Sequence, residues 1–188
     1  MTQYRLYTCV LWLAFCLLSL TGLTPAQAQE NQKNPPNIED FSENSLVIAS
    51  AKYLGATAES MAEIVDHAFS RYGMPSAIIR GEELSVSAMF GVRYGRGTLI
   101  FKDGREAPIY WRGPSLGVDM GATGSKSFAL VYNVNKPEDL HKRIAGIDGS
   151  LIAIGGVAFQ YLQRSSTVVA PMRVGVGYQV GISVGYMK

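Results

Sequence analysis

The residues best suited to hold a ligand are two short groups in which an arginine stands beside an aromatic side chain. Arg93-Tyr94 is the first group and Trp111-Arg112 is the second. A guanidinium can bind a carboxylate or phosphate through two parallel hydrogen bonds, and an aromatic ring can stack on a sugar or an acyl chain. We therefore expect these four residues to bind an amphipathic anionic molecule. The alternative is that the rings pack under a turn while the arginines extend to water.

One motif could support nucleophilic catalysis. Residues 113–117, Gly-Pro-Ser-Leu-Gly, match the G-x-S-x-G nucleophile elbow of serine hydrolases, and aspartates and His141 follow in the required chain order. That elbow needs a turn from a strand into a helix, but glycines rather than a helical pattern follow Ser115. We expect a tight turn with Pro114 at its corner. A serine hydrolase that uses Ser115 is the least favoured alternative, and we expect no enzymatic activity.

The sequence offers little support for a metal site or for a pair of residues that could act as general acid and base. His67 and His141 fall on separate helical stretches without carboxylates at ligand spacing. The adjacent carboxylates Glu82 and Glu83 would point to opposite faces of a strand, which disfavours paired acid–base work. We expect no catalytic residue, no metal and no cofactor.

The chain begins with the features of an export signal. Arg5 supplies a positive charge, residues 9–20 form an apolar stretch too short to span a membrane, and Ala26-Gln27-Ala28 is a cleavage site. Removal of residues 1–28 would remove both cysteines and lower the net charge from +2 to +1. So small a charge argues against nucleic acid as a partner. We predict a periplasmic monomer that is not an integral membrane protein, with a disordered linker over residues 29–45 and one domain over residues 46–188.

The amphipathic pattern predicts one strong helix over residues 57–72, with Thr57 as its N-cap and Gly73 after its end. Leu46-Val47-Ile48 fits either a strand or the start of a helix. Charge order predicts a short helical connection at residues 137–144. Turns are expected at residues 102–104, 121–124 and 148–149. Strands are predicted at residues 77–81, 84–94, 97–102, 107–111, 116–120, 127–132, 151–153, 157–164, 167–172 and 174–187.

The last strand is the clearest evidence for a barrel. From Val174 to Tyr186 every second residue is apolar, and the residues between are mostly glycine. Glycine weakens a strand and indicates strong coiling or close contact with another backbone. Strands joined by short turns favour antiparallel pairing. We predict a mainly β fold, a closed antiparallel barrel of about ten strands with one packed α-helix and the short helical connection. A sandwich of two sheets is the competing architecture.

A series of motifs resembles the cell-envelope integrity protein A family, small exported proteins of alphaproteobacteria. The resemblance runs from about Leu46 to the C-terminus, and its motifs occur in order. They are residues 81–83 (Gly-Glu-Glu), 93–99 (Arg-Tyr-Gly-Arg-Gly-Thr-Leu), 111–117 (Trp-Arg-Gly-Pro-Ser-Leu-Gly), 130–133 (Leu-Val-Tyr-Asn), 148–150 (Asp-Gly-Ser), 170–177 (Ala-Pro-Met-Arg-Val-Gly-Val-Gly) and 184–188 (Val-Gly-Tyr-Met-Lys).

The resemblance implies a periplasmic antiparallel barrel that is needed for envelope homeostasis, with no assigned chemistry to transfer. A looser similarity to lipid-binding barrel domains of the SYLF kind motivates a ligand. We therefore predict a non-enzymatic periplasmic barrel that supports cell-envelope integrity by binding a lipid, a glycan or an envelope protein. A small outer-membrane barrel is the first alternative. It is disfavoured by the helix at residues 57–72 and by the ending Tyr186-Met187-Lys188, which lacks a terminal aromatic residue.

Overall fold

The structure is a computed structural model that describes residues 40–141, 143–146, 152–174 and 184–187. The predicted export signal, residues 29–39 of the predicted linker and the predicted turn at 148–149 lie outside the described residues. So does most of the glycine-rich segment, residues 175–183.

The first described helix is α2, Glu43–Leu54. Ser42 is its N-cap and accepts a hydrogen bond from the backbone N–H of Ser45, and Gly55 ends the helix with a left-handed φ of 74°. Leu46 and Val47 are buried, so the apolar triplet at residues 46–48 belongs to a helix rather than a strand. Ordered structure therefore begins before residue 46, where the sequence placed the start of the domain.

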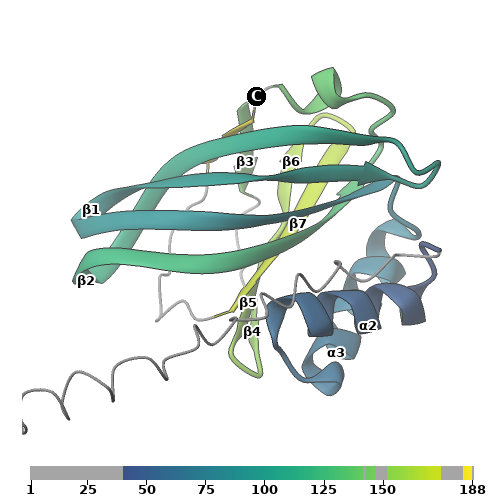
Figure 1. Cartoon of the computed structure of the whole chain (residues 1–188), viewed down its shortest axis with the longest axis horizontal. Coiled ribbons are helices and arrows are strands. Elements are labelled where there is room, and N and C mark those ends of the chain that lie inside the picture. The colour runs from purple at the N-terminus through teal and green to yellow at the C-terminus, as the bar shows by residue number, and fades with distance from the viewer. Residues whose placement is uncertain (1–39, 142, 147–151, 175–183, 188) are drawn as a thin grey trace, which may run out of the picture. The chain divides into compact units, whose positions relative to one another are not determined.

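The second helix is α3, Ala58–Tyr72, and it confirms the strongest prediction from the pattern. The Thr57 hydroxyl accepts from the backbone N–H of Ser60 over 3.2 Å, which satisfies one of the unpaired donors of the first turn. Gly73 follows the helix, as predicted. The sequence indicated one packed helix, but α2 and α3 both pack against the sheet (Figure 1).

Two long strands dominate the sheet. β1 covers Ala77–Phe101 and β2 covers Glu106–Tyr132, and they pair antiparallel from Ile100 opposite Glu106 to Ala77 opposite Val131. The predicted turn between them is confirmed, with Gly104 at a φ of 83°. Each strand replaces three predicted strands. The expected turns at residues 121–124 and around Pro114 are wrong, because both segments lie within β2.

The β1–β2 hairpin folds back on itself. Its register shifts between Ser87 and Met89, and near this point both strands reverse direction on the side remote from the helices (Figure 1). The two halves of β1 touch where Gly81 meets Gly97. A Cβ atom on either glycine would overlap the backbone of the other half. The absence of a side chain is thus what allows the two halves to make contact.

The rest of the sheet comes from short strands. A 3₁₀ helix, η1, covers Pro137–Leu140 and is followed by β3, Arg143–Gly146, so the predicted helical connection is a single turn that leads into a strand. The other strands are β4 (Ile152–Ile154), β5 (Val157–Phe159), β6 (Leu162–Arg164), β7 (Thr167–Val174) and β8 (Val184–Met187). Pairing follows the order β1-β2-β8-β3-β6-β7-β5-β4, and β2 also pairs with β7.

All of the described pairings are antiparallel, as expected. The two ends of β2 take different neighbours. Trp111 and Arg112 pair with β8, whereas residues 127–132 pair with β7. The described residues therefore form a mainly β, antiparallel sheet with two helices.

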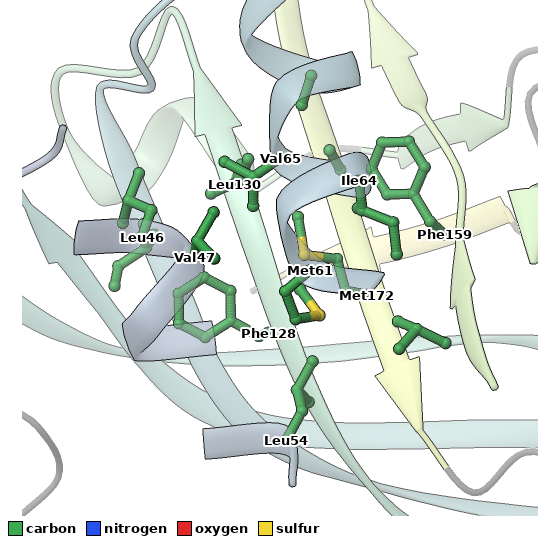
Figure 2. Close-up of a cluster of buried hydrophobic side chains, with 14 of the residues drawn as sticks. Leu46, Val47, Leu54, Met61, Ile64, Val65, Phe128, Leu130, Phe159 and Met172 are labelled. Atoms are coloured by element: carbon green, nitrogen blue, oxygen red, sulfur yellow. The ribbon is translucent and has the colours of Figure 1, made fainter. Parts of the chain in front are cut away.

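Alternation along the strands creates two apolar cores. The helix-covered core lies between the two helices and one face of the sheet, and Figure 2 shows Leu46, Met61 and Ile64 of the helices meeting Phe128, Leu130 and Met172 of the strands. The second core, which we call the inner core, occupies the other side of β2. Its buried residues are Ala77, Ile79, Leu99, Phe101, Ile109, Ala129, Val131, Val134, Leu140, Ile144, Leu162 and Val169.

Candidate ligand-binding site

The four residues predicted to bind a ligand divide between two faces of the β1–β2 hairpin. Arg93 is 8% exposed and faces inward, whereas its neighbour Tyr94 is 55% exposed. Trp111 packs against the inner core, and Arg112 is exposed. Tyr94 and Arg112 are register partners on the outer face. Adjacent residues on a strand point to opposite sides, yet Tyr94, Trp111 and Arg112 line one hollow, and Arg93, Trp111 and Arg112 line a second, smaller cavity.

A buried carboxylate organises the inward-facing pair. Glu83 is 3% exposed, and its Oε1 accepts a hydrogen bond from Trp111 Nε1 over 2.7 Å. Its Oε2 accepts from Arg173 Nε over 2.7 Å and lies 3.5 Å from Arg93 Nε. Arg93 Nε also donates to the hydroxyl of Ser85 over 3.4 Å. We call Glu83, Ser85, Arg93, Trp111 and Arg173 the Glu83 cluster.

The register of the sheet explains how residues so far apart in sequence meet. Ser127 of β2 is the partner of Gly81 on one side and of Arg173 on the other. Arg173 thus lies across β2 from β1, close to the position of Glu83. Arg93 joins them because the hairpin folds back. The Glu83 cluster therefore lies on the same inner face of the sheet as the inner core, next to one end of that core.

Burial and charge act against each other at this cluster. Burial alone would raise the pKa of Glu83, but the charges of Arg173 and Arg93, with the hydrogen bonds from Arg173 and Trp111, hold that pKa below its usual value. Burial, followed by repulsion from Arg173, lowers the pKa of Arg93 to about 10, although Glu83 opposes the shift. Glu83 is therefore ionised at neutral pH, and both arginines share its single negative charge.

Trp111 lies where the polar and apolar parts of the inner face meet. Its indole ring covers Gly95, its register partner, so closely that a Cβ atom there would overlap the ring. The ring therefore lies flat on the backbone of β1 while its nitrogen donates to Glu83. This fixed position makes Trp111 a sensitive reporter of changes in the cluster.

A large hollow adjoins the cluster. Its volume is about 1240 Å³, and it reaches Glu83 and Trp111 from the outer surface of the hairpin. Leu84, Tyr94 and Tyr110 give it an apolar lining, and its polar lining comprises Arg96, Arg112, Lys126, His141 and the carboxylate of Glu82, which lies 4.0 Å from Arg96. A smaller cavity of about 40 Å³ lies deeper, and its lining includes Arg93 and Arg173. Glu83, Trp111 and Arg112 line both spaces.

Sequence reasoning missed Glu83 and Arg173 as site residues. The Glu82-Glu83 pair drew attention only as a possible acid–base pair, and the structure confirms that the two side chains face opposite ways, since Glu82 is exposed. Arg173 carried a usable signal. It follows Val169 and Pro171 at the inward-facing positions of β7, where a charged side chain needs a buried partner.

The other sequence candidates take ordinary structural roles. His67 Nδ1 lies 2.9 Å from the Tyr161 hydroxyl, and the exposed imidazole of α3 stacks on the buried Tyr161 ring between β5 and β6. His141 ends η1, is exposed and lines the large hollow. Among the described residues, no group of three or more histidine, cysteine or acidic side chains is placed to hold a metal.

The fold and the site together define a class: a mainly β, barrel-like protein with a charged cluster at one end of its inner face. Residues 39–188 match the family model described as Envelope integrity protein A, and the chain belongs to that family. The resemblance seen in the sequence is thereby confirmed.

Comparison with solved structures supports the same grouping. The chain is similar to a beta-barrel-like, uncharacterized protein from Brucella abortus whose crystal structure is known, with a TM-score of 0.70 and 35% sequence identity. The match covers 79% of this chain and 94% of that chain. None of the curated proteins compared with the chain matches it. Within the part of the chain that the structure describes, no helix is long and apolar enough to cross a membrane.

Proposed function

We propose that this chain is a periplasmic, non-enzymatic barrel that supports envelope integrity by binding an amphipathic anionic molecule of the envelope, such as a lipid or glycan. The observation that carries the proposal is the hollow beside β1. It combines the apolar surfaces of Leu84, Tyr94 and Tyr110 with basic side chains, and it leads to Trp111. Concave sites with apolar walls and a few polar groups are the usual sites of small molecules.

Closure of the sheet into a barrel is part of this proposal. The pairings lead from one end of β2 through β8, β3, β6 and β7 to its other end. The contact between Gly81 and Gly97 brings together the two halves of β1, the strand at the edge of the described sheet. Nuclear Overhauser contacts between Trp111 and Met187, and between Arg143 and Tyr186, would support closure. Their absence in solution would favour an open sheet.

Binding is tested by titrating the protein that starts at Gln29 with a short-chain anionic lysolipid below its micelle concentration. Trp111 is then the only tryptophan in the chain, since Trp12 is removed with the signal. We expect a shift in its emission, and we expect Tyr110→Ala to weaken binding about tenfold by removing an aromatic wall. Met74→Ala is the matched control, because Met74 is an exposed apolar residue that does not line the hollow. Unchanged emission at every lysolipid concentration would contradict the proposal.

A binding role rather than catalysis is supported by the backbone around Ser115. Residues 113–117 continue strand β2, whereas a nucleophile elbow needs a turn from a strand into a helix. A fluorophosphonate probe should therefore fail to label the folded protein. Stoichiometric labelling that disappears in Ser115→Ala would establish a hydrolase instead.

One observation favours the outer-membrane alternative. Leu84, Val86, Val92 and Tyr94 are exposed on the outer face of the hairpin, while Glu83 and Arg93 are buried inside it. Membrane barrels have this arrangement, apolar outside and polar inside. This arrangement, apolar outside and polar inside, is confined to one end of the hairpin, since α2 and α3 cover the other end. Recovery in the periplasmic fraction would support our proposal, and strict recovery in the outer membrane with heat-modifiable mobility would support the alternative.

A further inference from the structure

The Glu83 cluster holds more positive than negative charge. Arg93 and Arg173 are each 8% exposed, and Glu83 is the one carboxylate among the described residues that line the deeper cavity. Two buried guanidinium groups therefore share one negative charge. Both pair with Glu83, but one carboxylate cannot neutralise two cations, and buried charge that is not neutralised is unfavourable because the interior does not replace the water that solvated it. The arrangement lacks one negative charge.

The hydrogen bonds of the two arginines show where such a charge would bind. Both side chains use their Nε atoms, Arg173 on Glu83 and Arg93 on Ser85, with Arg93 also within 3.5 Å of Glu83. The hydrogen bonds of both guanidinium groups to described residues use Nε, and none uses an Nη nitrogen. A guanidinium presents a planar fork that fits the oxygens of a carboxylate or phosphate. Two such forks therefore remain available.

The space beside these forks suits a small group. The deeper cavity of about 40 Å³ is lined by both arginines, whereas a single water needs only about 10–15 Å³. Ile79, Leu162 and Val169 give this cavity an apolar wall, whereas Arg93 and Arg173 give it positive charge. The large hollow shares Glu83, Trp111 and Arg112 with this cavity, so a head group in the cavity could continue into a chain or sugar in the hollow.

We propose that Arg93 and Arg173 form an oxyanion site that binds the carboxylate or phosphate head group of the ligand. This inference rests on the proposed function for the rest of the ligand, but the oxyanion site itself does not need the hollow. Trp111 would report occupancy, because its indole N–H donates to the same carboxylate that both arginines approach.

The decisive variant is Arg93→Gln. It removes the excess charge and leaves the pair of Glu83 and Arg173, whose atoms lie 2.7 Å apart, intact. The fold should therefore survive, and circular dichroism and the melting temperature would verify that it does. Arg105→Gln is the matched control, because Arg105 is an exposed arginine paired with Asp103 over 2.7 Å and lines neither space.

The probes are dodecyl phosphate, dodecanoate, the uncharged dodecanol and inorganic phosphate, each titrated against Trp111 emission and melting temperature. We expect both charged amphiphiles to bind at least ten times more tightly than dodecanol. Arg93→Gln should abolish that preference, and Arg105→Gln should leave it unchanged. Inorganic phosphate should raise the melting temperature of the unmodified protein but not of Arg93→Gln. If inorganic phosphate is the only probe that gives a response dependent on Arg93, the site binds a free oxyanion rather than a lipid head group.

The two proposals fail in different ways. If all three amphiphiles bind equally and Arg93→Gln changes nothing, the hollow binds acyl chains and the oxyanion site is refuted. If inorganic phosphate responds through Arg93 but no amphiphile binds, the oxyanion site stands and the amphiphile proposal falls. If neither phosphate nor any charged amphiphile produces an Arg93-dependent response, the oxyanion site is refuted whatever the hollow binds.

Discussion

The two ends of the β1–β2 hairpin use opposite arrangements of polarity. Near the 102–105 turn, Ile79, Leu99 and Ile109 fill the inside, and the helices cover much of the outside. At the end where the strands reverse, charged Glu83 and Arg93 are inside, while Leu84 and Val92 are exposed. The first end stabilises the fold by burying apolar surface. The second end depends on electrostatic balance, and that is why we place the site there.

The largest expected effect follows from removing the central charge. Glu83→Gln would leave Arg93 and Arg173 buried with no counter-charge, and we expect a loss of about 3–5 kcal/mol in the free energy of unfolding. Urea denaturation measures this loss. Glu82→Gln is the matched control and should have almost no effect, since Glu82 is exposed and its nearest ion pair is 4.0 Å long. If Glu83→Gln and Glu82→Gln lowered the free energy of unfolding equally, the Glu83 cluster would be accessible to water.

The same substitution has a consequence for pH dependence. The pKa of Glu83 in the folded protein lies below its ordinary value. The stabilisation that Glu83 provides is therefore fully present above the unfolded pKa and is lost as the pH falls through the folded pKa. Glu83→Gln should flatten the acid side of the stability profile. An acid limb of undiminished steepness would assign acid unfolding to other carboxylates.

A smaller effect is expected where the halves of β1 touch. Gly97→Ala would push a methyl group into the backbone at Arg80 and Gly81, at a cost of roughly 1–3 kcal/mol. Gly124→Ala is the control on the partner strand, because no heavy atom lies within 4 Å of the position its methyl would take. The difference in urea midpoint between the two variants measures how tightly the hairpin closes. Equal midpoints would show that the two halves are separated in solution.

The helix-covered end offers a modest test. Thr57→Ala removes the side chain that caps α3 and should cost about 1 kcal/mol. If the two ends are independent, the variant should lower the melting temperature without altering Trp111 emission, because separate sites contribute additively. Glu59→Gln, in the first turn of the same helix, keeps the cap and should cost less. A change in Trp111 emission would show that the helices influence the Glu83 cluster.

The smallest effect at neutral pH concerns Tyr161, at the helix-covered end. Burial, and then the nearby Tyr72, raise its pKa to about 12. Its stabilising contribution is present below the unfolded value near 10 and is lost as the pH rises through 12. Burial raises the pKa of Tyr132 as well, so absorbance titration of tyrosinate should show several late-ionising groups, and Tyr161→Phe should remove one of them, with Tyr94→Phe as an exposed control. A profile in which all tyrosines ionise near 10 would contradict the burial of this ring.

Local signals predicted the parts of the fold that local physics determines. The stripe of Met61, Ile64 and Val65 between Thr57 and Gly73 identified α3, and Gly104 identified the main turn. Antiparallel pairing and a mainly β class also followed from alternation. The start of α2 was missed because its apolar triplet at residues 46–48 is too short to distinguish a helix from a strand.

Tertiary contact decided the features that the sequence did not reveal. Glycines such as Gly81 and Gly97 suggested breaks between strands, but they lie within one strand because two backbone segments meet there. All four predicted binding residues line at least one of the two spaces, but the sequence did not show that Arg93 and Trp111 lie on the inner face while Tyr94 and Arg112 lie on the outer face. The partner Arg173 is 90 residues from Glu83 in sequence, and only the register of β2 with β7 brings the two together.

The folded-back hairpin also implies an order of assembly. Pairing of β1 with β2 starts beside a short turn and extends one residue pair at a time, so each step closes only a small additional loop. Glu83, Arg93 and Trp111 can thus meet while the chain up to Tyr132 is the only part that has folded. Arg173 arrives with β7, after a much longer loop has closed, and such non-local steps are the slow ones. We therefore expect the emission of Trp111 to reach its native value in two kinetic phases, the slower of which marks the arrival of Arg173.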